Sequence, residues 1–170
     1  DINRYLDGMT VMSSQVKNIL INNGVSIPIK VCGLGLDHIQ SHHSNEDLNI
    51  NVKSFIFLHL SSCFPRKGIL QLLHAYGSSF NKIDDVSLVI KTTKNPHNNL
   101  VEVLQKLKEK NPEYPHVLVL DEDFSDSQIK SLYKSSNALI APSLGEGFGM
   151  PIGEAMALEI PVITTGWGGQ

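Results

Sequence analysis

Cysteines, aromatic residues and long apolar runs are all scarce in this chain of 170 residues. The two cysteines, Cys32 and Cys63, stand alone and lack the spacing of a metal site. Isolated thiols fit a reducing compartment, so we expect a cytoplasmic protein. No apolar run approaches the roughly 20 residues that span a bilayer, and no signal peptide is visible.

An excess of basic residues is missing as well. Lysine and arginine total 14 against 17 acidic residues, which gives a net charge of −3 without any basic block. This balance argues against nucleic acid as a partner. The apolar fraction of 41% and the charged fraction of 18% are those of an ordinary globular protein. The chain starts at Asp1 and stops in a glycine-rich stretch, so we expect a piece of a longer protein.

From residue 54 onward, apolar runs alternate regularly with amphipathic segments. Strands that are apolar on both faces and alternate with helices indicate a parallel sheet covered on both sides. The sequence therefore predicts an α/β fold, a Rossmann-like doubly wound parallel sheet. The expected strands are 54–60, 86–92, 116–120, 138–141 and 161–165, and the expected helices are 67–80, 98–111, 125–136 and 151–159.

The first fifty residues have a different organisation. A helix at 15–24 follows two serines, of which Ser13 or Ser14 is the expected cap. Residues 40–53 are polar and have no period, which is typical of a linker. We therefore expect an N-terminal part at 1–40, a linker at 41–53 and the α/β domain at 54–170.

A glycine-rich stretch, GEGFGMPIGE at 145–154, follows the expected strand at 138–141. In doubly wound sheets, ligands bind at the carboxyl ends of the strands. Gly147 and Gly149 allow the backbone to approach a ligand closely. Pro151 starts the next helix, whose free N–H groups and dipole suit an anion such as a diphosphate.

Two carboxylates bracket the same stretch. Glu154 lies one turn inside the expected helix, where it can accept hydrogen bonds from the two vicinal hydroxyls of a ribose. Glu146 lies on the loop, nearer the place of a sugar. The alternative is that Glu154 only caps the helix and that the glycines only form a turn; the whole pattern favours a binding site.

The stretch PSLGEGFGMPIGEAMALEIPVITT at 142–165 resembles the signature of retaining glycosyltransferases with the GT-B fold. The resemblance implies a C-terminal domain that binds a nucleoside-diphosphate sugar of the UDP or GDP type, with no other cofactor and no metal. It implies that Glu154 binds the ribose and that Glu146 acts in catalysis by orienting the sugar. The remaining residues implied to hold the donor here are Gly147, Phe148, Gly149, Met150 and Pro151.

A second matching stretch is FPRKGILQLLHAY at 64–76. In the family, the lysine of the Lys-Gly pair grips the donor diphosphate, which implies a catalytic and binding role for Lys67. A lysine at the amino end of a helix adds a point charge to the amide dipoles, and Arg66 is a second candidate. Many members carry a further arginine where this chain has Ser61 and Ser62, so one phosphate contact is either absent or supplied by Arg66.

Residues 11–37, ending in Gly35-Leu36-Asp37, resemble the end of the family's N-terminal domain. This resemblance implies that 1–40 is the tail of an acceptor-side domain whose remainder is missing. The implied partners are that domain and an acceptor glycan or lipid-linked sugar of cell-surface polysaccharide synthesis. The implied location is the cytoplasm, at the inner face of the membrane in the full-length protein, and the isolated chain is expected to be inactive.

Asp121 and Asp123 offer a competing interpretation. Their Asp-x-Asp pattern after a strand is similar to the metal-binding pair of GT-A transferases. The simpler interpretation is a loop whose acids favour the start of the next helix. The resemblance to the GT-B family implies that the backbone of 120–124 lies near the nucleotide base. A sugar-nucleotide epimerase or phosphorylase and a non-catalytic nucleotide-binding module are further alternatives.

The histidines show no catalytic arrangement in the sequence. His38, His42 and His43 lie at or in the polar linker and are expected to be solvated. His59 falls within a strand, which predicts a core or sheet-edge histidine, and His74 is expected on a helix surface.

Overall fold

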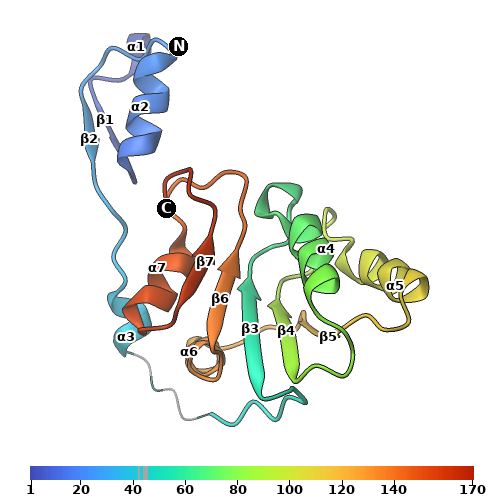
Figure 1. The fold of residues 1–170 in the computed structure, drawn as a ribbon. Helices are drawn as coiled ribbons and strands as arrows, with labels where there is room; N and C mark the ends of the chain where they lie inside the picture. Colours follow the sequence, from blue (N-terminus) through green and yellow to red (C-terminus); the bar gives the residue numbers. More distant parts are fainter. Residues whose placement is uncertain (42, 44–45) are drawn as a thin grey trace.

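The computed structural model describes residues 1–41, 43 and 46–170. Its centre is a five-stranded sheet in the order β5-β4-β3-β6-β7 (Figure 1). Every neighbouring pair of strands is parallel, which confirms the predicted α/β fold. The strands are β3 (Phe55–Leu60), β4 (Val86–Lys91), β5 (His116–Leu120), β6 (Ala138–Ala141) and β7 (Val162–Thr164).

Helices cover both faces of this sheet. One face packs against α4 (Ile69–Ser79) and α5 (Leu100–Lys110). The other packs against α6 (Asp126–Lys134) and α7 (Met150–Ala157). In the part of the chain that the structure describes, no helix is long and apolar enough to cross a bilayer.

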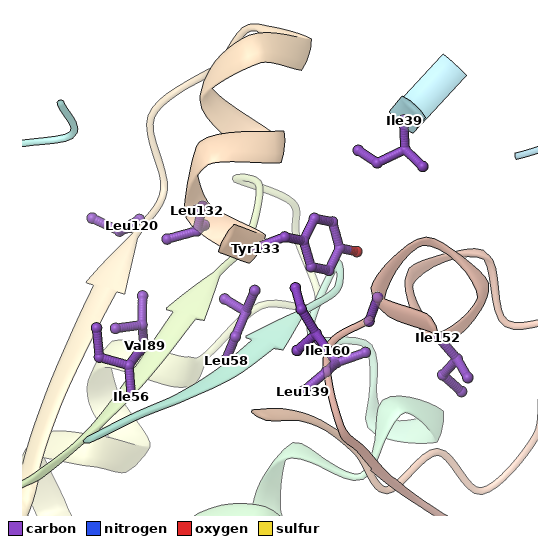
Figure 2. Packing of buried hydrophobic residues seen from close by; sticks show 11 residues of the cluster. Ile39, Ile56, Leu58, Val89, Leu120, Leu132, Tyr133, Leu139, Ile152 and Ile160 are labelled. Atoms are coloured by element: carbon purple, nitrogen blue, oxygen red, sulfur yellow. The ribbon is translucent and has the colours of Figure 1, made fainter. Parts of the chain in front are cut away.

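The core on the second face is built where apolar positions of β3, β4 and β6 meet α6 and α7. Leu58, Leu139 and Leu132 are fully buried and lie together in Figure 2. The same view shows the Tyr133 ring pointing from α6 toward α7. Burying each large apolar side chain contributes about 1.5–3 kcal/mol, so this layer fixes the position of α7.

Side-chain caps set two helix starts. As predicted, Ser13 accepts a hydrogen bond from the Val16 amide and begins α2 (Ser14–Asn22). Ser125 and Gln128 form a reciprocal capping box at the start of α6.

One predicted helix start is wrong. The helix expected at 67–80 begins at Ile69, because Pro65–Lys67 form a separate 3-10 turn. Gly68 between them is left-handed, with φ of 73°. Lys67 therefore lies on a turn before the helix and not within it.

The N-terminal part is a small unit of its own. It contains α1 (Ile2–Tyr5) and two short parallel strands, β1 (Met9–Val11) and β2 (Ile29–Val31), that pair beside α2. Figure 1 shows this unit set apart from the five-stranded sheet. Within it, Cys32 is exposed, whereas Cys63 in the larger domain is buried.

The connection between the two parts is more ordered than a polar linker. Helix α3 (Asp37–Ser41) lies beside α7. Farther along, Leu48, Ile50 and Val52 pack against the core of the α6 and α7 face. Three apolar side chains therefore hold this part of the segment 41–53 on the core. The assignment of 41–53 as a linker and the division into domains stay predictions.

Candidate functional site

A cavity of about 490 Å³ opens at the carboxyl edge of the sheet. The central strands β3 and β6 are neighbours there, while β4 and β7 extend the sheet in opposite directions. Such a change of direction is where open α/β sheets bind ligands. The cavity walls include Ser61, Ser62, Lys67, Lys91, Asp123 and Pro151.

Glu146 contacts both basic residues that the sequence analysis named as candidates, Lys67 and Arg66. Lys67 Nζ donates to Glu146 Oε1 over 2.5 Å, and Ser143 Oγ donates to the same oxygen over 2.7 Å. Arg66 lies 3.6 Å from the other carboxylate oxygen and donates to the Gly145 carbonyl. The structure thus joins the loop after β3 to the loop after β6.

The surroundings of Glu146 favour its charged form. Burial alone would raise the pKa of this carboxyl. The hydrogen bonds from Lys67 and Ser143, with the charges of Lys67 and Arg66, outweigh that effect and lower the pKa. Glu146 is therefore a fixed negative charge that orients Lys67.

Glu154 is held by two side chains, neither of which the sequence connects with it. Tyr133 donates its hydroxyl to Glu154 Oε2 over 2.8 Å, and His38 Nε2 lies 2.8 Å from Oε1. Burial, together with the charge of Glu154, raises the pKa of Tyr133. Tyr133 therefore stays a neutral donor that fixes the carboxylate on α7.

The glycine-rich loop is shaped by close backbone approaches. Gly149 takes a φ of 86° directly before α7, which places Met150 and Pro151 in the first helical turn. A side chain at Gly147 would meet Met12 of the N-terminal unit. Phe148 lies beside Gly33, so this loop also contacts the N-terminal unit.

Asp121 and Asp123, the pair that would bind a metal in the GT-A interpretation, have different surroundings in the structure. Asp123 lines the cavity. Asp121 lies 3.9 Å from the exposed Lys94 instead. Within residues 1–41, 43 and 46–170, no group of three or more His, Cys, Asp or Glu side chains is arranged to hold a metal ion.

Four of the five histidines named in the sequence analysis can be compared with the structure. His59 is buried, as expected of a core residue; its Nδ1–H donates to the Ile140 carbonyl, and burial lowers its pKa. His43 and His74 are exposed. His38 is also exposed, as predicted, with 45% of its side chain accessible, and α3 in addition places it against Glu154. His42 lies outside the described residues.

Sequence reasoning missed Ser143, Tyr133 and Lys91 at this site. Ser143 stands in the quoted Pro-Ser pair, so the motif itself contained a signal. In the sequence, Tyr133 looks like an ordinary residue of an amphipathic helix, and Lys91 like the end of an apolar strand. Only the packing of α6 and the end of β4 brings them to the site.

The topology and the position of the cavity define an open, doubly wound parallel α/β domain with a candidate ligand site at the switch point of its sheet. The chain belongs to one family of proteins with such a domain. Residues 41–170 match the family described as "Glycosyl transferases group 1".

Individual relatives agree with this family. A serotype-specific mannosyltransferase, WbdA of Escherichia coli, is 34% identical over 107 residues, which are 63% of this chain and 13% of the relative. The MMP alpha-(1->4)-mannosyltransferase of Mycolicibacterium hassiacum is 28% identical over 158 residues, 92% of this chain and 36% of the relative. The chain thus spans only a minor part of these curated relatives.

A solved structure supports the fold. The crystal structure of Anabaena Alr3699/HepE in complex with UDP-glucose matches 99% of this chain and 47% of its own, with a TM-score of 0.80 and 22% sequence identity.

Proposed function

We propose that this chain is the donor-binding part of a retaining glycosyltransferase. The reaction moves a hexosyl group from a nucleoside-diphosphate sugar to an acceptor hydroxyl and keeps the anomeric configuration. The mannosyltransferase relatives support mannose as the hexosyl group. The residues outside this chain supply the acceptor side, so the 170-residue chain binds donor without turnover.

The observation that carries the proposal is the pair of basic side chains, Lys67 and Arg66, at the switch point of the sheet. Lys67 and Arg66 face Glu146 across two loops, beside the 490 Å³ cavity and the start of α7. A lysine ammonium has three N–H donors. Lys67 can therefore keep its bond to Glu146 while a second donor reaches a phosphate oxygen.

Each residue then has a physical task. Lys67, Arg66 and the first turn of α7 stabilise the negative charge that develops on the departing diphosphate. Glu146 orients Lys67 and accepts hydrogen bonds from the sugar hydroxyls. Glu154, fixed by Tyr133, accepts from the ribose hydroxyls. The loop at 120–124 faces the base, and no metal takes part.

Calorimetric titration of the chain with UDP, GDP and ADP in EDTA tests the proposal. We expect one of the three to bind with a dissociation constant in the micromolar range, about −8 kcal/mol. Binding that appears only after Mn²⁺ is added would favour the Asp121 and Asp123 interpretation. Absence of binding under both conditions would contradict a donor-binding chain. Binding without transfer by the full-length protein would leave a non-catalytic module.

Replacing Glu154 with alanine should weaken the binding of nucleoside diphosphates at least tenfold and leave the binding of inorganic pyrophosphate unchanged. The physical reason is that a carboxylate accepts hydrogen bonds from ribose hydroxyls, each worth about 1.5–3 kcal/mol when the acceptor is charged, but has nothing to offer a phosphate. Parallel titrations of both ligands measure the difference.

Glu159→Ala provides the matched control, because Glu159 is exposed after the same helix and does not line the cavity. An equal loss for pyrophosphate and nucleotide in Glu154→Ala would contradict the ribose role.

A further inference from the structure

Lys91 is a buried lysine at the carboxyl end of β4, and the site described above gives it no role. Its exposed fraction is 5%, and it lines the 490 Å³ cavity together with Lys67. Nζ donates to the Thr92 carbonyl over 2.8 Å and lies 5.1 Å from the centre of the Phe124 ring. These contacts use one of the three N–H donors of an ammonium group.

The charge of this lysine is not balanced in the unliganded chain. No carboxylate of the described residues lies within the 4.0 Å ion-pair distance of Lys91 Nζ. Asp123 lines the same cavity but makes no ion pair with it. A buried charge without an opposite charge is unfavourable, so the cavity is built to receive negative charge from elsewhere.

The other two cations differ from Lys91 in this respect. Lys67 and Arg66 are already neutralised in part by Glu146. Ser61 stands at one of the two positions where the family resemblance implies a further arginine in many members. Its hydroxyl already has partners within the chain, because Oγ contacts His59 Nε2 and accepts a hydrogen bond from the Cys63 amide. Lys91 is thus the cavity cation that is free to pair with a ligand.

We propose that Lys91 binds a phosphate oxygen of the donor diphosphate, from the β4 side of the cavity, and replaces the arginine that is absent at Ser61 and Ser62. This inference rests on the proposed function, because the ligand is the same diphosphate. It adds a third cation, on a different strand from Lys67. A diphosphate between β3 and β4 then has an ammonium group on each side.

Pyrophosphate titration of two neutral variants tests this inference. Lys91→Met keeps the length of the side chain without its charge, and Lys91→Gln also keeps a donor for the Thr92 carbonyl. We expect both variants to bind pyrophosphate, and the nucleoside diphosphate that the unmodified chain prefers, about 10- to 100-fold more weakly. Lys94→Met is the control, because Lys94 is 83% exposed and lies outside the cavity wall; its affinity should stay within twofold.

Thermal unfolding without ligand provides an independent readout. Removing an unbalanced buried charge should leave the melting temperature of Lys91→Met unchanged or raise it by about 2–4 °C. If either variant folds and binds as tightly as the unmodified chain, Lys91 is not a ligand. If both variants lose affinity only together with a large fall in melting temperature, Lys91 is a structural residue and the inference is wrong. If the unmodified chain binds neither pyrophosphate nor any nucleotide, the proposed function itself fails and this inference with it.

Discussion

Replacing Gly68 with alanine should lower the free energy of unfolding by about 4 kcal/mol or more. A Cβ at this position would lie 2.1 Å from the carbonyl oxygen of Pro142. The left-handed φ of 73° adds a further cost of about 1–3 kcal/mol for a residue with a side chain. Since the obstacle is backbone, no side-chain rotation relieves it, and the loops after β3 and β6 would have to separate. Urea unfolding followed by circular dichroism measures the change.

Gly145→Ala is the matched control for this prediction. It lies on the same loop as the site, and its Cβ would meet nothing within 4 Å. We expect this variant to stay within about 0.5 kcal/mol of the unmodified chain. A Gly68→Ala variant that also stayed within 1 kcal/mol would show that the two loops do not approach each other as the structure describes.

Replacing Lys67 with alanine should reduce the affinity for a nucleoside diphosphate about 100-fold, which corresponds to about 2.7 kcal/mol. The substitution removes a cation from the cavity wall and also leaves Glu146 facing the ligand without its partner. Because Lys67 and its neighbour Arg66 lower the pKa of Glu146, that pKa should rise in the variant. Calorimetric titration measures the affinity, and circular dichroism shows that the fold persists.

Lys82→Ala is the control for Lys67. Lys82 donates to Glu113 in an ion pair of the same kind, but both side chains are more than half exposed and away from the cavity. Its loss should change neither nucleotide affinity nor stability by more than about 1 kcal/mol. The double variant Lys67→Ala, Glu146→Gln should recover part of the lost affinity, because the exposed negative charge is gone. Unchanged affinity in Lys67→Ala would remove Lys67 from the site.

Local patterns in the sequence were sufficient for most of the sheet and for the start of α2. The strands at 86–91 and 116–120 follow from short apolar runs, and the serine pair at 13–14 indicates where α2 begins. The left-handed Gly68 was missed because the amphipathic period continues across it. The close approach of the Pro142 carbonyl, which leaves no room for a side chain at Gly68, is a tertiary contact that no local pattern contains.

The same difference between local patterns and tertiary contacts explains which residues of the site could be predicted. The motif residues Lys67 and Glu146 could be named in advance because they belong to recognisable stretches, and the structure brings them together. The contact of His38 with Glu154 joins residues 116 positions apart, and the placement of the buried Lys91 at the cavity depends on how β4 ends beside Phe124. Such contacts depend on tertiary packing, so neither composition nor periodicity reveals them.

The pairing of β3 with β6 has a consequence for how the chain folds. Strands β3, β4 and β5 can pair in the order of synthesis, whereas the contact of Lys67 with Glu146 closes a loop of 79 residues. Long loops close late because their closure costs more entropy before any contact is gained. A chain with only β3–β5 in place already carries Lys67 and Lys91 but lacks Glu146 and α7. Nucleotide binding should therefore appear in the final folding phase, so that a bound ligand reports a completed sheet.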